Sequence, residues 1–386
     1  MKLIAHFVFK ECIVTVFWLS GVFRLFRWLN RNRLIILTYH GVLPSGSGID
    51  GYEGRNVVDE EAFSWQMRYL AKHYRCVPLE EAVQRLASGR PLPRYTVAVT
   101  FDDGFQNNLR YAFPILRWRG IPASIFLTTG HIGHGTKLLW TERVGRLLAK
   151  AAVPQTVMLP GDPLPLTLSL ETAEQREDAR RLALKWLKAM PSRRRDQAIQ
   201  ELDNQLRRVS SDDDEVVAPD SDRYSFLTWT EVRELANRGV TIGSHTVDHP
   251  ILTSVDDKRR VDEVVQSKRD IERHLKAPCR LFSYPNGTPR DFDDRDKANL
   301  QRAGYVAAVA QIAGVNDEHT DRFALRRLNI GHGHTPQLFI AQVSGFWPWM
   351  GSVAERWSKI AAVSGERFRR GLAGANLLER TAGGGE

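Results

Sequence analysis

Short apolar runs alternate with longer amphipathic segments through most of the chain. The runs have the length of β-strands, and each is followed by a polar or glycine-containing turn. They lie at residues 34–38, 96–100, 123–128, 240–243, 280–284 and 305–309. Helices are predicted between them at 59–73 and 230–239. Thr228 or Thr230 is the expected N-cap of the second helix, and Gly239 is its expected stop. This alternation predicts an α/β fold with a parallel sheet.

Reactive side chains follow four of these runs. They are His40 after the first run, Asp102 and Asp103 after the second, His245 after the fourth and Asn286 after the fifth. In a parallel barrel, the loops at the carboxyl ends of the strands converge, so ligand-binding side chains gather there. The sequence therefore predicts a single site at that end of a barrel.

The alternation of predicted strands and helices is interrupted between about residues 141 and 224. This segment contains a proline-rich stretch at 159–166 and a charged helical stretch at 171–189. We expect a mostly helical insertion within a barrel that occupies residues 33–345. Residues 346–386 are predicted to form a C-terminal helix and a flexible tail, because the chain ends in a glycine-rich segment.

The amino-terminal residues 1–32 form a separate region. Their longest uncharged run, residues 12–23, is shorter than the roughly 20 apolar residues that span a bilayer. Lys10 and Glu11 interrupt the apolar stretch, which makes it a poor secretory signal. Polar side chains then recur at helical spacing opposite apolar ones, at Ser20, Arg24, Arg27 and Arg31. This pattern predicts an amphipathic helix on an anionic membrane surface. The alternative is a helix docked on its own domain.

Composition and charge narrow the class of protein. With 386 residues, 42% of them hydrophobic and 26% charged, the chain can bury a large core, which excludes a disordered, collagenous or small disulfide-rich protein. Much of the net charge of +9 lies in the amino-terminal segment, so we expect no nucleic-acid partner. The cysteines, Cys12, Cys76 and Cys279, are far apart and predict no disulfide.

Two residue clusters have the chemistry of a metal site. Asp102 and Asp103 end a predicted strand, where adjacent carboxylates repel each other unless a cation lies between them. His245 and His249 are four residues apart, so both imidazoles can reach one ion from the same side of a helical turn. Together with Asp103 they offer two nitrogens and one oxygen and leave room for water, as in catalytic zinc sites. Cobalt and nickel suit the same ligands.

These motifs resemble a known family, the polysaccharide deacetylases of the NodB-homology type, carbohydrate esterase family four. The matching segments are TFDDG at 100–104, HTVDH at 245–249 and FSYPNG at 282–287, and LTYHGV at 37–42 is similar to the permuted branch that deacetylates exopolysaccharides. The resemblance covers residues of about 33–135 and 225–335. It implies a distorted (β/α) barrel, a divalent metal and the removal of acetyl groups from sugars.

The resemblance also implies roles for individual residues. Asp103, His245 and His249 would hold the metal. Asp102 would be the general base toward a metal-activated water. The backbone N–H of Asn286 would then donate to the oxyanion.

His40 would be the acid that protonates the leaving amine. The late histidine that usually serves as the acid in this family has no clear counterpart, and His332 and His334 compete with His40 for the role. In this family an arginine often precedes the proline of the motif that matches FSYPNG. Here Ser283 stands in its place, and Arg280 lies three residues earlier. Four residues are predicted to bind substrate or support the site: Arg280, Tyr284, Tyr39 and Gly104.

The function implied is the hydrolysis of N-acetyl groups on amino sugars of a polysaccharide or lipid-linked glycan. O-acetyl ester hydrolysis, or glycan binding without catalysis, are the alternatives. The sugar and its linkage stay open. The missing signal favours the cytoplasm or the cytoplasmic face of the inner membrane, whereas relatives of this kind often act outside it.

Overall fold

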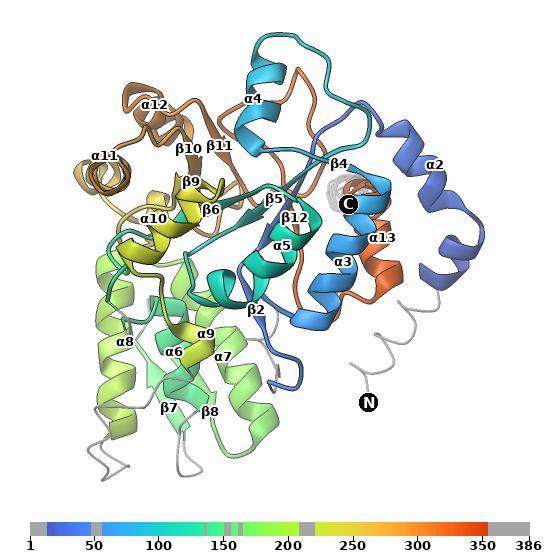
Figure 1. The fold of residues 1–386 in the computed structure, drawn as a ribbon. Coiled ribbons are helices and arrows are strands. Elements are labelled where there is room, and N and C mark those ends of the chain that lie inside the picture. Colours follow the sequence, from blue (N-terminus) through green and yellow to red (C-terminus); the bar gives the residue numbers. More distant parts are fainter. Residues whose placement is uncertain are drawn as a thin grey trace, which may run out of the picture.

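The computed structural model describes residues 14–47, 56–134, 137–149, 156–160, 165–207 and 221–353 (Figure 1). Predictions for residues 1–13 and 354–386 lie outside this part of the chain. Residues 346–353, at the start of the predicted C-terminal region, are helical.

A parallel sheet of eight strands forms the centre of the fold, in the order β11-β10-β9-β6-β5-β1-β12, with β4 also paired to β5. The strands are β1 (Ile35–Tyr39), β4 (Arg75–Cys76), β5 (Thr96–Phe101), β6 (Ala123–Leu127), β9 (Thr241–Ser244), β10 (Leu281–Ser283), β11 (Ala307–Val309) and β12 (Leu328–Asn329). A parallel bridge joins Val309 to Leu325, so the chain leading into β12 also lies beside β11. This closes the sheet into the distorted (β/α) barrel predicted from the sequence, and the predicted fold class is confirmed.

Helices surround the barrel (Figure 1). They are α3 (Glu60–His73), α4 (Leu79–Ala87), α5 (Phe113–Arg119), α10 (Trp229–Asn237), α11 (Asp257–Leu275), α12 (Asp294–Arg302) and α13 (Pro336–Val343). Capping fixes where they begin: Asp59 accepts two backbone N–H groups at the start of α3, and Thr228 forms a capping box with Glu231 at the start of α10. Thr228, of the two candidates, is therefore the N-cap of α10.

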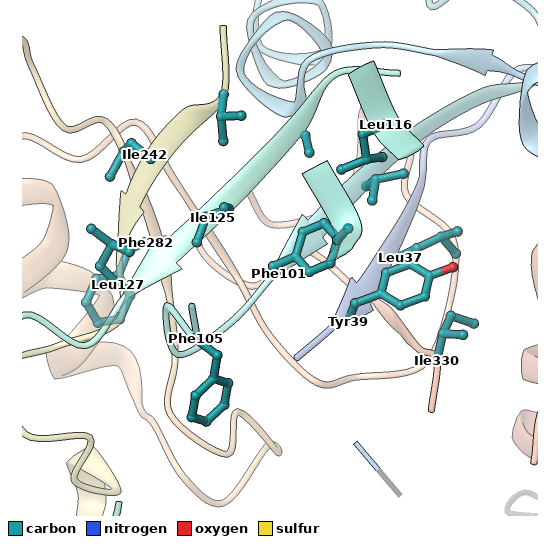
Figure 2. Packing of buried hydrophobic residues seen from close by; sticks show 14 of the residues in the cluster. Leu37, Tyr39, Phe101, Phe105, Leu116, Ile125, Leu127, Ile242, Phe282 and Ile330 are labelled. Carbon is teal, nitrogen blue, oxygen red and sulfur yellow. The ribbon is translucent and has the colours of Figure 1, made fainter. Parts of the chain in front are cut away.

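Apolar side chains fill both faces of the sheet, which explains why the strands read as continuous apolar runs. All residues of β1 and β5 are buried. Figure 2 shows Leu37, Phe101 and Ile125 of three adjacent strands packed together, with Leu116 of α5 over them. The strand residues that point to the other face of the sheet, such as Ile36, form a second apolar cluster. This packing holds the carboxyl ends of the strands, and the residues that follow them, in fixed positions.

Smaller elements complete the barrel end. β2 (Gly41–Leu43) pairs in parallel with β3 (Val57–Asp59). A π-helical turn spans Asn108–Ala112, and a 3-10 turn spans Leu252–Ser254. β2 begins directly after His40, so this small sheet fixes the chain beside that residue.

The insertion predicted at about 141–224 forms a module with its own core (Figure 1, green). Its elements are α6 (Trp140–Ala149), β7 (Thr156–Leu159), β8 (Leu166–Ser169), α7 (Ala173–Lys188), α8 (Ser192–Arg207) and α9 (Ser221–Tyr224). The antiparallel pair of β7 and β8 was not predicted from the sequence. Buried Leu159, Leu184 and Leu202 join this sheet to the helices.

The amino-terminal helix packs on the protein itself with one face. Helix α2 (Val22–Leu29) follows Gly21, whose φ of 77° separates it from the preceding helical turns. Phe23 and Phe26 contact the ring of Phe346. Part of the apolar face predicted from the sequence therefore docks on the protein, and the rest of it, at Leu25, Trp28 and Leu29, is exposed. None of the described helices is both long and apolar enough to cross a membrane.

Candidate active site

Three side chains that could hold a metal ion meet at the carboxyl end of the barrel. Asp103 follows β5, and His245 follows β9 directly. The Nε2 atoms of His245 and His249 each lie 3.5 Å from Asp103 Oδ1. One ligand atom from each residue lies within 4.8 Å of the other two. The structure thus brings together the three residues that the sequence predicts as ligands.

The geometry and the chemistry of this cluster fit a divalent ion. Ligands in a tetrahedron about 2.0–2.1 Å from an ion lie roughly 3.3 Å apart, close to the 3.5 Å between Asp103 Oδ1 and each imidazole nitrogen. Asp103 Oδ1 is buried and has no hydrogen-bond partner among the described residues. His245 Nδ1 lies 2.7 Å from the carbonyl oxygen of Ser283 and donates to it, which leaves the Nε2 lone pair for a metal.

Burial shifts the pKa values of all three residues. It lowers the pKa of both His245 and His249, so both imidazoles are neutral and able to bind a metal. It raises the pKa of Asp103, and the nearby charge of Asp102 raises it further. A bound cation would compensate the buried charge of Asp103.

The prediction that the two histidines share a helical turn is wrong. Residues 245–249 form an irregular loop, because Thr246 and His249 have left-handed φ values of 70° and 57°. Two consecutive backbone N–H groups of this loop donate to Glu263 Oε2, at 2.8 and 3.0 Å. The Glu263 carboxylate therefore holds the loop in the shape that directs both imidazoles toward Asp103.

Asp102 is paired with a buried arginine, Arg327. The guanidinium donates two hydrogen bonds to the Asp102 carboxylate, at 2.8 and 2.7 Å. It also donates to Ser283 Oγ at 2.9 Å, and that hydroxyl donates to Asp102 at 3.3 Å. Burial alone would raise the pKa of Asp102, but the charge and hydrogen bonds of Arg327 outweigh it and hold the pKa well below its usual range. Asp102 is therefore ionised and fixed in orientation.

Arg280, predicted to support the site, lies elsewhere. Its guanidinium forms an exposed ion pair with Glu80 at 2.8 Å. Arg327, which no sequence motif indicates, takes the position beside Asp102. It precedes β12, a strand of two residues that is too short to leave an apolar run. Its neighbour Arg326 makes the segment look like solvated surface charge, so no sequence signal marked it.

Of the three candidate acids, His40 lines the same cavity as the metal ligands. Its Nδ1 is buried without a hydrogen-bond partner in the described part of the chain. Burial lowers the pKa of His40 to about 4. His332 is exposed, and His334 Nδ1 bonds to the backbone of Gly331. Neither is among the described lining residues of the cavity, so the geometry favours His40 over both.

Asn286 lies in the cavity wall between two charged groups. Its amide Nδ2 donates to Asp291 at 2.6 Å, and its Oδ1 accepts from Lys188 Nζ at 2.6 Å. Its φ is 60°, in the left-handed region. Lys188 is the last residue of α7, so through this hydrogen bond the insertion holds the loop that contains Asn286. No pattern in the sequence marks Lys188 as a site residue.

The three other predicted supporting residues belong to the packing of the barrel. Tyr39 is fully buried, and its hydroxyl donates to Gln66. Tyr284 stacks on Phe292 and is also buried. Neither tyrosine is among the described residues that line the cavity, so their predicted contact with substrate is not seen. At Gly104, with φ of 89°, a Cβ would lie 2.8 Å from the Leu127 side chain, so glycine is required there for the turn itself.

The cavity at this site has a volume of about 420 Å³ and two kinds of wall. The barrel supplies one wall, which holds the three candidate metal ligands together with Asp102 and His40. The insertion supplies a second wall, formed by Trp140, Glu142, Arg180, Lys188, Arg223 and Tyr224. The insertion is therefore part of the candidate active site.

Comparisons with known proteins place the site residues within the matched region of a known family. The model of the family described as polysaccharide deacetylase matches residues 89–160 and 197–308, which include Asp102 and all three candidate metal ligands. YxkH of Bacillus subtilis, which carries the name of the same family, is 20% identical over 312 residues, 81% of this chain and 76% of its own length. Poly-beta-1,6-N-acetyl-D-glucosamine N-deacetylase of Staphylococcus epidermidis is 32% identical over 131 residues, 30% of this chain and 45% of its own length.

A solved structure shows the same fold. The Streptococcus pyogenes deacetylase PplD, in complex with acetate, superposes with a TM-score of 0.53 at 16% identity. The match covers 81% of this chain and 99% of that one. The family match, with the four site residues inside the matched ranges, identifies a polysaccharide deacetylase domain, the domain of a hydrolase family, in this chain.

Proposed function

We propose that this chain removes N-acetyl groups from amino-sugar residues of a polysaccharide or lipid-linked glycan, using a divalent metal ion held by Asp103, His245 and His249. Zinc fits this set of two nitrogens and one oxygen, and cobalt and nickel are alternatives. The observation that carries the proposal is the convergence of these three residues beside an ionised Asp102. A site with a base but no ligands, or with ligands but no base, would not support hydrolysis.

The residues around the cluster have distinct tasks in this mechanism. A divalent ion would supply a polarised acetyl carbonyl and a water of lowered pKa. Asp102 accepts the proton of the attacking water, because Arg327 keeps its carboxylate ionised and oriented. The backbone N–H of Asn286 donates to the oxyanion that develops on the acetyl group.

His40 donates a proton to the leaving nitrogen in this mechanism. Its pKa of about 4 makes it neutral at neutral pH in the free protein. The proton that it donates must therefore arrive during the reaction. An amine leaves only when protonated, whereas an alkoxide leaves more easily, so N-deacetylation depends more strongly on this residue than ester hydrolysis does.

Release of acetate from purified glycans tests the proposed reaction. We expect the protein to release acetate from N-acetylglucosamine oligomers, to lose this activity in a chelator and to regain it with zinc. Release from O-acetylated glycans alone would replace the N-deacetylase with an esterase. No release from any glycan by protein with metal bound would favour a glycan-binding domain.

We also propose that the amino-terminal helices attach the protein to an anionic membrane surface. The face of α2 turned away from the protein leaves Leu25, Trp28 and Leu29 between 51% and 53% exposed. The guanidinium of Arg31 lies 4.2 Å from the centre of the Trp28 ring, and Arg24 is exposed. Apolar and aromatic side chains beside arginines suit the boundary between headgroups and acyl chains. The cytoplasmic face of the inner membrane, with its anionic lipids, is the location we propose.

Flotation with vesicles tests this attachment. Replacing both Trp28 and Leu29 with serine removes apolar area worth roughly 1.5–3 kcal/mol for each buried side chain. We expect the native protein to float with phosphatidylglycerol vesicles and the double variant to bind them at least tenfold more weakly. Trp118→Ser is the matched control, because Trp118 is 75% exposed but lies on α5. Equal flotation of the double variant and the native protein would contradict the proposal.

A further inference from the structure

The insertion places a lysine ammonium in the wall of the active-site cavity. Lys188 is the last residue of α7, and its partly buried side chain lines the cavity with the three metal-binding residues. Its Nζ donates to the neutral amide oxygen Asn286 Oδ1 at 2.6 Å. An ammonium has three N–H donors, so this bond uses one of them.

The charge of Lys188 has no ionic partner in the described part of the chain. No carboxylate oxygen of those residues lies within 4.0 Å of its Nζ. The nearby carboxylate of Asp291 instead accepts from the Asn286 amide and from the backbone N–H of Thr288. Burial accordingly lowers the pKa of Lys188. A partly buried ammonium whose only acceptor is a neutral amide is costly unless a further anion binds.

The charges around Lys188 also favour an anionic ligand. The described lining of the cavity holds four cationic side chains, Arg180, Lys188, Arg223 and Arg327. It holds three carboxylates, Asp102, Asp103 and Glu142. Arg327 is matched by Asp102, and a divalent ion on Asp103 would add further positive charge. Arg180 also lies 3.8 Å from the carboxylate of Glu177. A neutral acetamido sugar offers no group to match the charge of Lys188.

We propose that Lys188 binds an anionic group of the substrate, a carboxylate or a phosphate carried close to the acetylated amino sugar. This inference rests on the proposed deacetylase function and makes its substrate class more specific. Lys188 then acts as a specificity-determining residue supplied by the insertion. An acidic polysaccharide offers the carboxylate, and a phosphorylated or lipid-linked glycan offers the phosphate.

A purely structural role for Lys188 is the competing explanation, because its ammonium also holds Asn286. Two substitutions separate the roles. Lys188→Gln keeps a donor for Asn286 Oδ1 but removes the charge, whereas Lys188→Arg keeps the charge. Lys185→Gln is the matched control, because Lys185 is exposed one turn earlier on the same helix.

The kinetic experiment compares three substrates. They are a neutral N-acetylglucosamine oligomer, an oligomer in which N-acetylglucosamine alternates with glucuronate, and an N-acetylglucosamine oligomer bearing a phosphate ester. We expect Lys188→Gln to reduce kcat/KM for one of the charged substrates at least about tenfold more than for the neutral one. The charged substrate that is affected identifies carboxylate or phosphate as the source. Equal losses on all three substrates would overturn the proposal, and so would a glutamine variant that matches the native protein.

A binding measurement separates this proposal from the proposed function. Metal-free native protein and Lys188→Gln are titrated with a glucuronate oligomer, a glucose oligomer bearing a phosphate ester and a neutral glucose oligomer, none of which is acetylated. We expect the native protein to bind one charged ligand at least about tenfold more tightly than the variant does. Without that difference, the role of Lys188 is refuted even if acetate is released. If the difference is present but native protein releases no acetate, only the deacetylase function is refuted.

Discussion

Replacing Asp102 with asparagine is expected to slow acetate release by about 10²–10⁴-fold, the range typical of a lost general base. Asparagine keeps the size of the side chain but cannot accept the proton of the attacking water. The measurement is kcat at saturating N-acetylated substrate. Asp102 is not one of the three metal-binding residues, so the variant should bind zinc as the native protein does. A variant that retains native kcat would remove Asp102 from the role of base.

Substitution of Arg327, the ion-pair partner of Asp102, tests the same assignment of the base. Arg327→Met leaves the Asp102 carboxylate buried without its cation, which is expected to lower the free energy of unfolding by about 3–5 kcal/mol. It should also raise the pKa of Asp102, so that activity falls at a higher pH as the solution is acidified. Arg280→Met is the control, because Arg280 forms an exposed pair with Glu80. If Arg280→Met moved the pH profile and Arg327→Met did not, the assignment of the orienting arginine would be wrong.

The strands and the metal cluster could be predicted because their signals are local. Strands of a parallel sheet are buried on both faces, so each appears in the sequence as an uninterrupted apolar run. Asp102 and Asp103 are adjacent, and His245 and His249 lie within one short loop. Each pair remains together whatever the exact backbone conformation. The three residues therefore meet as predicted, although residues 245–249 form a loop and not the predicted helical turn.

Contacts made across the fold could not be predicted in this way. Arg327 is 225 residues from Asp102 in the sequence, and no local pattern connects them. Lys188 reaches Asn286 from a different module, 98 residues earlier. Both residues lie in charged segments that resemble solvated surface. The burial of Tyr39 and Tyr284 likewise depends on contacts outside their motifs, with Gln66 of α3 for Tyr39 and with Phe292 for Tyr284.

Metal binding by the native chain and by His245→Ala addresses the central claim, that Asp103, His245 and His249 hold one divalent ion. Removing an outer-shell partner of a metal ligand costs about 10–100-fold in affinity, so removing a ligand should weaken zinc binding by more than about a hundredfold. Asp103→Asn provides a second variant that preserves side-chain size. His319→Ala is the control, because His319 is exposed and distant from the cluster in sequence.

The deciding measurement is a zinc titration of these folded proteins after removal of all metal. The account predicts one tightly bound zinc per chain in the native protein and in His319→Ala, with that site lost in His245→Ala and Asp103→Asn. A native protein that binds no zinc, cobalt or nickel, or a His245→Ala variant that binds zinc with native affinity, would contradict it.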